Sequence, residues 1–451
     1  MKEYRFSFPT PVEQILATLN DRGFEAYAVG GCVRDTLLSK APNDWDVTTS
    51  ATPAQIKEAF SDCRVIETGI QHGTVGVLLN GAVYEITTYR CDGEYLDNRH
   101  PSSVTFSANI ADDLCRRDFT VNAMAYSPKS GFVDLFGGTE DLARGVIRCV
   151  GDPTKRFLED GLRILRAIRF AAVLDFSIDP ATEAAIRSCR DLLSGIAAER
   201  VREEFCKLLC GKGAVRVIRA YTDVLGVCIP ELLPMRGFDQ NTRYHCYDVL
   251  EHTLHALEEN SDADLVTRLA ILFHDVGKPH CYTEDAQGGH FKGHAPIGVE
   301  IVARVMKRLR FDNETTARVK MLVDLHDLPI CANTRSVRRL MSKLSDGDIL
   351  RLLEIKRCDR LAHAEFFRAL PAELFEIPRL MAELRAADAC LSLRDLAING
   401  EDLLRMGMQP GRAMGALLQS LFEDVMDERL ENDREQLLRE AEKRRAQYED
   451  M

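Results

Sequence analysis

The feature that most limits the fold of this chain is a change in hydrophobic periodicity near residue 150. Before it, short β-branched and apolar runs predict strands that alternate with helical patterns. The strand-like runs are 26–34, which leads into a Gly-Gly turn, 64–67, 74–79 and 83–89, and the helical patterns are 11–20, 35–39 and 53–60. From residue 154 helical periodicity continues to the end. We therefore expect an α+β protein, with a mixed sheet and helices in about the first 145 residues and an all-α remainder.

Composition narrows the class of protein. A length of 451 residues leaves room for two or more domains, and 45 % hydrophobic residues is ordinary for a globular protein. No run approaches the about 20 apolar residues of a membrane helix, and the N-terminus lacks the apolar core of a secretory signal. The 14 cysteines form no Cys-x-x-Cys pair and predict reduced thiols in a cytoplasmic protein. A net charge of −12 argues against indiscriminate nucleic-acid binding but permits a local basic face.

Two glycines follow the first strand-like run. Gly30 and Gly31 precede Arg34. Glycines let backbone N–H groups approach a polyphosphate, and an arginine supplies the counter-charge. A Gly-Gly turn by itself is more often only a turn, so the interpretation depends on the acidic residues that come next.

Three carboxylates predict a metal site. Asp44 and Asp46 would point to the same face if their segment is a strand, and they would repel each other unless a divalent cation lies between them. An isolated pair of this kind is more often a solvated loop. Glu85 lies in the run VYEITTY and is expected to face inward, where it needs a partner. Together the three predict two Mg²⁺ ions that activate an attacking 3′-hydroxyl and stabilise a triphosphate.

Four motifs occur in order along this first domain: GGCVRD (30–35), NDWDVTTSATP (43–53), EITTYR (85–90) and RRDFTVNAMAY (116–126). In them the chain resembles the class II polymerase-β-type nucleotidyltransferases, which are the bacterial CCA-adding enzymes and their poly(A) polymerase relatives. The resemblance implies template-independent addition of C, C and A from CTP and ATP to the 3′ end of tRNA, with release of pyrophosphate. It also implies four parts: a catalytic head (1–147), a neck that reads the base (148–220), a helical body (221–385) and a helical tail (386–451).

The motif RFLEDGLRILRAIRF (156–170) is predicted to form one amphipathic helix. Glu159, Arg163 and Arg166 share its polar side, which is also typical of ordinary i,i+4 ion pairs. Cytosine and adenine both present an amino donor beside a ring-nitrogen acceptor. Asp160 could therefore accept from the amino group while Arg163 donates to the ring nitrogen, and uracil and guanine would be rejected.

The resemblance extends the nucleotide site beyond this pair, with Arg34 and Arg117 at the nucleotide and Arg166 and Arg169 lining its site. The full predicted set is Gly30, Gly31, Arg34, Arg117, Asp118, Asn122, Glu159, Asp160, Arg163, Arg166 and Arg169. The polar segment 92–106 resembles the flexible loop that CCA-adding enzymes need for the switch from C to A addition. Its Asp97 and Arg99 favour addition of the complete CCA end.

Nine of the eleven histidines lie between residues 245 and 363. His274 and Asp275 adjoin at the end of an apolar helix in LAILFHDVGKP (269–279). With His252 upstream and Asp359 downstream they resemble the metal centre of an HD domain.

The remaining histidines are divided between this centre and the core. His294 and His326 would suit a second metal or a substrate phosphate, whereas His245, His255 and His363 are interpreted as structural. Imidazole and carboxylate ligands suit Mn, Fe, Ni or Mg without selecting among them. The ordered set predicts a phosphohydrolase as a second function. In similar CCA-adding enzymes such a domain is linked to removal of 2′,3′-cyclic or terminal phosphates from damaged RNA ends.

The tail contains a G-x-x-P-G-R turn between two amphipathic helices in 398–425, which is typical of simple helix packing. The resemblance suggests that backbone N–H groups and Arg412 lie near tRNA phosphates. The terminal segment 427–450 is expected to be a solvated helix that could serve in a homodimer.

Three alternatives remain open from the sequence. The first is a poly(A) polymerase, or an enzyme limited to A or C-C addition, although the acidic tail disfavours a polymerase. The second is a phosphohydrolase with a vestigial transferase head, against which the intact Asp44, Asp46 and Asp160 argue. The third is a signalling-nucleotide synthetase–hydrolase, in which the hydrolase usually comes first.

Overall fold

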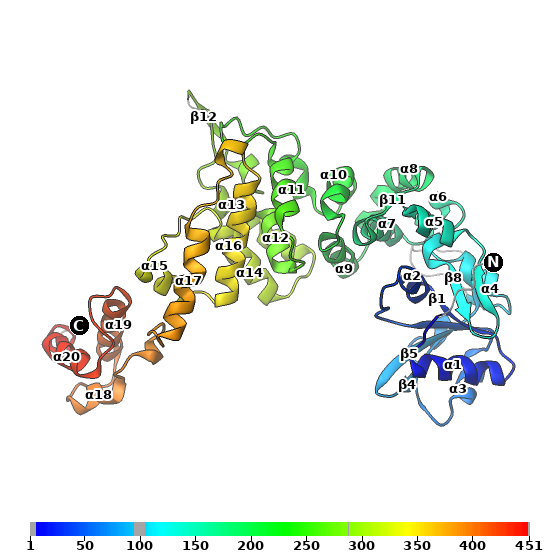
Figure 1. Ribbon diagram of the computed structural model, residues 1–451, viewed down its shortest axis with the longest axis horizontal. Coiled ribbons are helices and arrows are strands. Elements are labelled where there is room, and N and C mark those ends of the chain that lie inside the picture. The colour runs from blue at the N-terminus through cyan, green and yellow to red at the C-terminus, as the bar shows by residue number, and fades with distance from the viewer. Residues whose placement is uncertain (1–5, 94–103, 287, 450–451) are drawn as a thin grey trace. The chain divides into compact units, whose positions relative to one another are not determined.

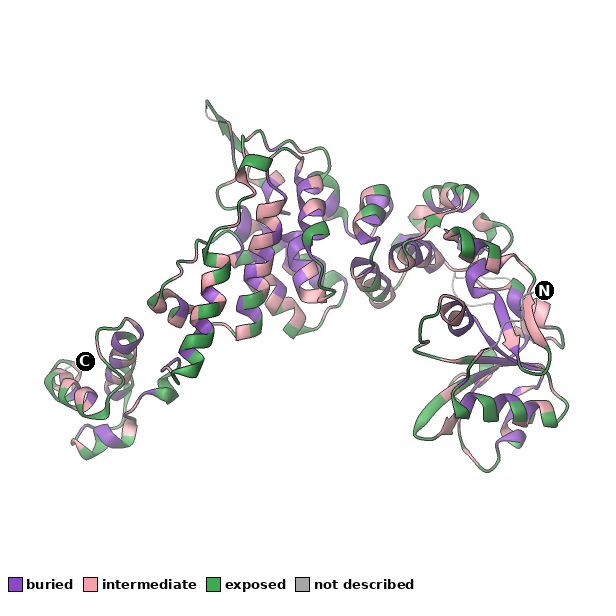
Figure 2. Cartoon of the chain, in the orientation of Figure 1, coloured by how far each residue is buried: buried purple, intermediate pink, exposed green. Residues whose placement is uncertain are grey.

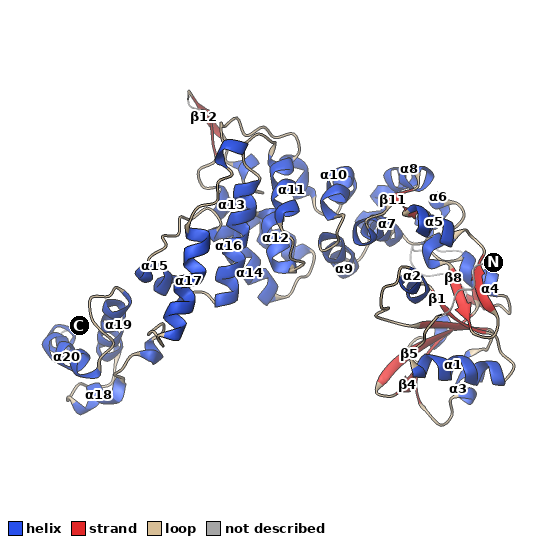
Figure 3. Ribbon diagram, in the orientation of Figure 1, coloured by secondary structure: helices blue, strands red, loops and turns tan. Residues whose placement is uncertain are grey.

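The computed structural model describes residues 6–93, 104–286 and 288–449, and the chain forms two compact units. The first unit extends to Leu233 and includes Arg308–Arg310, and the second comprises the rest. Figures 1 and 3 show that the large sheet belongs to the N-terminal part, as expected for an α+β protein. The predicted boundary at residue 220 falls inside helix α10 (Ala214–Leu225), and body and tail share one unit. The division into four parts stays a prediction.

The head is built on a seven-stranded sheet of order β3-β4-β5-β2-β1-β8-β9. Its neighbouring strands are antiparallel except for β2 and β5, which run parallel. The strands are β1 (Ala26–Val29), β2 (Asp46–Thr49), β3 (Arg64–Ile66), β4 (Thr74–Leu79), β5 (Ala82–Thr88), β8 (Met124–Ser127) and β9 (Gly131–Asp134). The remaining short pairs of this unit are β6 (Arg90–Asp92) with β7 (Val104–Phe106) and β10 (Val146–Ile147) with β11 (Ser177–Ile178).

The two faces of the sheet follow the period of two that a strand imposes. One face packs its apolar side chains, such as Ala28, Val47 and Ile86, against helices α1 (Thr10–Asp21) and α3 (Pro53–Ala59). The opposite face carries Val29 and Ala125, which pack with residues of α4 (Ile110–Cys115). Figure 2 shows the buried residues along these elements. The residues that alternate with Val47 and Ile86 therefore lie on the face that α1 and α3 leave free.

Two sequence expectations about the segment between β1 and β2 are wrong. Helix α2 (Gly31–Leu37) begins four residues before the predicted 35–39, because the carbonyl oxygen of Gly30 already accepts from the N–H of Arg34 at 3.1 Å. Asp44 does not share a strand with Asp46. The register pairs Val29 with Asp46, and β1 ends at Val29, so residue 44 has no strand partner.

The neck motif is also broken where one helix was predicted. Helix α6 (Pro153–Glu159) ends before Asp160, whose φ of −145° and ψ of 106° are extended, and α7 (Leu162–Leu174) starts two residues later. The Asp160 carboxylate accepts from the N–H of Leu162 at 3.0 Å, so it satisfies the first backbone donor of α7, whose N-cap residue is Gly161. Ile164, Leu165 and Ile168 are buried, as the periodicity predicts. The other neck helices are α8 (Pro180–Cys189), α9 (Ala198–Leu209) and α10.

The second unit is almost entirely helical. Its helices are α11 (Val249–Glu259), α12 (Leu265–Phe273), α13 (His294–Arg308), α14 (Asn313–Leu325), α15 (Thr334–Met341), α16 (Asp346–Leu361), α17 (Glu373–Ala386), α18 (Gly400–Arg405), α19 (Arg412–Met426) and α20 (Arg434–Glu449). The hairpin β12 (Thr283–Asp285) and β13 (Gly288–His290) departs from the all-α expectation. The terminal helix begins at 434, and its Leu437 and Ala441 are buried in the tail core rather than solvated. Its role in dimerisation stays a prediction. No helix in the described ranges is long and apolar enough to cross a membrane.

Candidate active site and candidate metal centre

The turn after β1 requires glycine at its first position. Gly30 has a φ of 82°, which places it in a region that L side chains rarely occupy. A Cβ at this position would lie 2.9 Å from Nη1 of Arg117. The turn therefore brings backbone and guanidinium together in a way that any other residue would disturb.

Strands β2 and β5 place two of the three predicted carboxylates on one face of the sheet. Val47 pairs with Ile86 in parallel register, so Asp46 and Glu85 precede that pair on the face left free by α1 and α3. All three carboxylates are exposed, and the expectation that Glu85 faces inward is wrong. A side chain that alternates with buried Ile86 must point to the open face.

Asp46 nevertheless lies among other charged groups. Protein atoms around it displace part of its hydration, which raises the pKa of Asp46; the nearby Arg117 opposes this shift and the Asp44 carboxylate adds to it. The surroundings therefore disfavour the charged form of Asp46, although its side chain remains accessible to water. A divalent cation would remove that penalty, which fits the predicted Mg²⁺ site.

A chain of polar contacts links this loop to the neck. Arg34 donates from Nη1 to the Asn122 side-chain oxygen at 2.6 Å, and Asn122 donates to Asp118 at 3.1 Å. Arg166 of α7 donates to Asp118 from Nε at 2.8 Å and from Nη2 at 2.6 Å. Burial by itself would raise the pKa of Asp118, but Arg166 and the Asn122 amide outweigh it and hold that pKa well below its usual range.

Three of the predicted arginines gather around Phe170. The guanidinium carbons of Arg34, Arg166 and Arg169 lie 5.0, 5.5 and 3.5 Å from the centre of its ring. Arg169 also donates to Glu204 of α9 at 2.7 Å. The cluster gathers three positive charges around one ring, and Asn122, Asp118 and Glu204 accept from their guanidinium groups.

The two predicted base readers have protein partners in the structure. Asp160 accepts from Arg200 at 2.8 Å, and Arg163 donates to Glu159 at 2.6 Å and to the carbonyl oxygen of Arg116 at 3.1 Å. These contacts hold both side chains at the break between α6 and α7.

Sequence reasoning missed several members of this site. They are Asp113, which binds Arg116 and Arg117, together with Phe170, Arg200 and Glu204. Glu204, an acidic residue inside the predicted helical region, was a signal, because a buried carboxylate needs a cationic partner. Asp97 and Arg99 lie outside the described residues. Arg412 is exposed at the start of α19.

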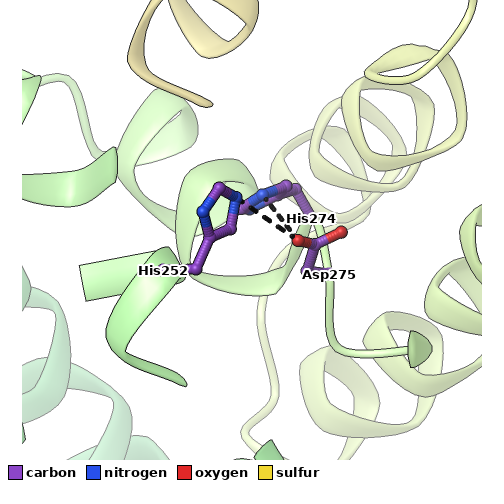
Figure 4. Close-up of side chains that lie close together, drawn as sticks. All are labelled: His252, His274 and Asp275. Carbon is purple, nitrogen blue, oxygen red and sulfur yellow. Dashed lines mark ion pairs between the residues drawn. The ribbon is translucent and has the colours of Figure 1, made fainter. Parts of the chain in front are cut away.

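The predicted HD residues converge inside the second unit. His252 comes from α11, His274 and Asp275 follow α12, and Asp359 lies on α16. Nε2 of His252 is 2.8 Å from Asp359 and 3.6 Å from Oδ2 of Asp275, and Nε2 of His274 is 3.2 Å from the same Oδ2. Figure 4 shows both imidazoles directed at that carboxylate.

Two further histidines face the other oxygen of the same aspartate. Nε2 of His294 and of His326 lie 3.6 and 3.8 Å from Oδ1 of Asp275, and 3.1 Å from each other. Asp275 thus separates two groups of candidate metal ligands, one on each carboxylate oxygen. Gly277 permits this packing, because a Cβ there would collide with the backbone of His294.

The rings of this centre share one orientation. Nδ1 of His274, His294 and His326 lies 2.7 to 2.9 Å from a backbone carbonyl oxygen. A carbonyl only accepts, so Nδ1 carries the proton and the Nε2 lone pair is directed inward, as in metal sites. The buried Nε2 of His274 has no hydrogen-bond partner within the described part of the chain. The donor set therefore fits a divalent cation.

Despite the burial of His274, Asp275 and Asp359 raise its pKa to about 10, so a divalent cation bound at its Nε2 would displace a proton. Burial disfavours the charged form of Asp275, but His274 and Lys278 hold its pKa well below the usual range. Nζ of Lys278 lies 2.6 Å from that carboxylate. Burial lowers the pKa of His326 to about 3, so its ring is neutral and available as a ligand.

Two histidines that were interpreted as structural, His245 and His363, lie beside this centre. Nδ1 of His363 donates to the carbonyl oxygen of Asp359 at 2.7 Å, and His363 joins His252 and Asp359 in a third candidate ligand group. Both residues line a pocket of about 350 Å³ at the centre, which also contains Lys278 and Lys292. Their proximity depends on helix packing, which no local sequence signal reports.

Comparisons with known proteins identify relatives of the chain. The chain matches family models for a Poly A polymerase head domain (26–148), for an RNA and SrmB binding site of polymerase A (175–232) and for tRNA nucleotidyltransferase domain 2 (297–441). It is 35 % identical to a protein of Lactobacillus helveticus over 424 residues, or 93 % of each chain. It is 36 % identical to one of Limosilactobacillus fermentum over 433 residues, or 96 % of each chain. Both relatives are named CCA-adding enzyme.

Solved structures extend the comparison to the fold. The Bacillus stearothermophilus CCA-adding enzyme in complex with CTP has a TM-score of 0.72 and 27 % identity, covering 98 % of this chain and all of that one. The Thermotoga maritima CCA-adding enzyme, solved with tRNA, shares the fold with a TM-score of 0.60 at 21 % identity, covering 97 % of this chain and 96 % of that one.

Proposed function

The chain belongs to the family of bacterial CCA-adding enzymes, and on that premise we propose how its own residues add C, C and A from CTP and ATP to the 3′ end of tRNA. The observation that carries the proposal is the junction at residues 117 and 118. The positive charge of Arg117 opposes the rise in the pKa of the Asp46 carboxylate that burial causes. The adjacent Asp118 accepts from Arg166 of the neck. Catalytic carboxylates and base-reading helix are thereby joined through two consecutive residues.

Asp44, Asp46 and Glu85 are proposed to hold Mg²⁺, which supplies neutralising charge at the triphosphate and activates the 3′-hydroxyl. The raised pKa of Asp46, caused by lost hydration and increased by Asp44, supports a cation there. Arg34 and Arg117 are proposed to bind the triphosphate beside the Gly30 turn. Their guanidinium groups are fixed by Asn122 and Asp113, so little side-chain entropy is lost when a phosphate binds.

Asp160 and Arg163 are proposed to read the base. Asp160 can accept from the amino group that C and A share, and Arg163 can donate to the adjacent ring nitrogen. A U or G would place an acceptor oxygen against the Asp160 carboxylate, which cannot donate to it. Asp160 would then keep its contact with Arg200, which donates to it at 2.8 Å. Only a base that donates to Asp160 can therefore compete with Arg200 for this carboxylate.

The test uses tRNA transcripts that end before the CCA tail, after C and after C-C, with each NTP alone and together. Growth by three nucleotides that needs both CTP and ATP and then stops is expected. Growth by C-C alone or unlimited addition of A would contradict the proposal. Asp46→Ala should abolish addition, whereas Asp62→Ala, which removes an exposed carboxylate elsewhere in the head, should leave it unchanged.

A second function is proposed for the histidine centre: metal-dependent hydrolysis of a phosphoester. The inward Nε2 atoms and the two ligand groups that share Asp275 support it. A divalent cation there would supply a hydroxide nucleophile at neutral pH, and Lys278 and Lys292 in the adjoining pocket would attract the phosphate. The test measures phosphate release with Mn²⁺, Ni²⁺ or Mg²⁺ by the wild type and Asp46→Ala. Loss of release in Asp46→Ala would mean that the activity is not separate from the head.

A further inference from the structure

A second pocket adjoins the histidine centre within the same unit. Its volume is about 410 Å³, and it shares His326, Asp327, Asp359 and His363 with the basic pocket described above. Three of these four are candidate metal ligands. A ligand in the second pocket would therefore reach the centre directly.

The second pocket differs from the first in chemistry. Leu353, Leu374 and Ile377 contribute apolar surface, and Arg360 and Phe367 form one side. The Arg360 guanidinium lies over the Phe367 ring, 3.4 Å from its centre, and is anchored by donation from Nε to the carbonyl oxygen of Ala369 at 3.1 Å. A planar cation stacked on an aromatic ring next to apolar side chains is suited to a flat, polar-edged ring system.

Aromatic residues continue beyond the pocket. The Phe367 ring centre is 4.8 Å from that of Tyr244 and 5.2 Å from that of His363. Tyr244 is tied to this turn, because its carbonyl oxygen accepts from the N–H of Ala364 at 2.8 Å. Phe366 is 68 % exposed. Large aromatic side chains held at the surface beside cations are the features with which proteins stack nucleobases.

We propose that this pocket binds the nucleobase of a nucleoside phosphate whose phosphate lies at the histidine centre. The proposal rests on the phosphohydrolase function proposed above and names its substrate class. A simple phosphomonoester would use the metal ligands and the lysines, but it would leave the Phe367–Arg360 surface uncovered. The same base could come from a free nucleotide or from the last residue of an RNA chain.

Binding is tested first on the full chain treated with a chelator, so that no hydrolysis occurs. 2-Aminopurine riboside 3′-phosphate is the probe, because stacking quenches its fluorescence. Phe367→Leu should weaken the quenching interaction about tenfold, since one base–aromatic stack is worth that order, and Phe367→Tyr should restore it. Phe375→Leu is the matched control, because Phe375 is 63 % exposed and lies outside the pocket lining. Equal binding by Phe367→Leu and wild type would overturn the proposal.

Hydrolysis with added Mn²⁺ separates this proposal from the phosphohydrolase function. Phe367→Leu should raise KM about tenfold for 3′-AMP, or for a short RNA with a 3′-phosphate, and leave glycerol 2-phosphate unchanged. Whichever of the two nucleotide substrates responds identifies the source of the base. Equal effects on glycerol 2-phosphate and both nucleotides would refute the base pocket. Probe binding that depends on Phe367 without hydrolysis of any substrate would support the pocket and refute the hydrolase.

Discussion

Asp118→Asn tests whether the contact between head and neck depends on charge. The Asp118 side chain is 9 % exposed and receives two N–H groups of Arg166, one from Asn122 and the backbone N–H of Phe119. An asparagine has the same shape, but in either orientation its NH₂ group would face N–H donors, those of Arg166 or those of Asn122 and Phe119. We therefore expect the substitution to remove the negative charge and to set one N–H donor against another, while the backbone stays undisturbed.

The magnitude follows from the burial of the pair. Removing one partner of a buried ion pair costs about 3–5 kcal/mol, but the Arg166 side chain is 33 % exposed and has Glu204 at 3.9 Å. We expect a loss of about 2–3 kcal/mol, near the range of hydrogen bonds to charged groups. With a urea m-value of about 2.5 kcal/mol/M, the unfolding midpoint should fall by about 1 M.

The assay uses the single tryptophan. Trp45 packs against the head core, so its fluorescence reports unfolding of the unit that contains Asp118. Asp175→Asn is the control, because its partner Arg216 is exposed and asparagine tolerates the φ of 57° at that position. A midpoint shift below about 0.3 M for Asp118→Asn, with an unchanged m-value, would refute the reasoning.

The pH dependence has a defined sign. Arg166 and Asn122 hold the pKa of Asp118 below its unfolded value despite burial. Its stabilising contribution is therefore fully present above the unfolded pKa of about 3.9 and is lost as the pH falls toward the folded pKa. The midpoint difference between wild type and Asp118→Asn should be constant from about pH 7 to pH 5 and narrow only below about pH 4. A difference that varies near neutrality would indicate another titrating group.

Three further predictions concern single positions. Gly30→Ala should destabilise the first unit by about 2 kcal/mol and weaken CTP binding, because residue 30 has a φ of 82° and lies close to Arg117. Gly31→Ala should be tolerated, since its Cβ would meet nothing nearer than 3.7 Å. Urea titration and CTP binding measure both variants, and unaltered CTP affinity in Gly30→Ala would contradict the close approach. Asp160→Ala should permit incorporation of UTP and GTP in single-nucleotide assays, and unchanged selectivity would exclude it as the base reader. Asp275→Asn should reduce bound metal per chain, measured by mass spectrometry of the purified protein, without affecting nucleotide addition; full metal content would place the metal elsewhere.

Elements with strong local signals could be predicted from the amino-acid pattern alone. The strands at 64–67, 74–79 and 83–89 and the helix at 53–60 were predicted closely, since hydrophobic period and capping residues act within a few positions. The ordered motifs were enough to predict the family to which the chain belongs. His274 and Asp275 could be associated with His252 and Asp359 because their residue types and order are unusual together.

Features that depend on contacts between residues distant in sequence could not be predicted and became visible in the folded chain. The start of β2 at Asp46 is set by where β1 ends, and Glu85 faces solvent because its register against β2 buries Ile86. The break at Asp160 requires a carboxylate to replace a helical hydrogen bond, which a smooth amphipathic pattern does not reveal. His363 reaches the metal centre through the packing of α16 against α11. Each of these outcomes depends on which strands pair and which helices pack together. The hydrophobic period of one segment carries no information about the segment that packs against it.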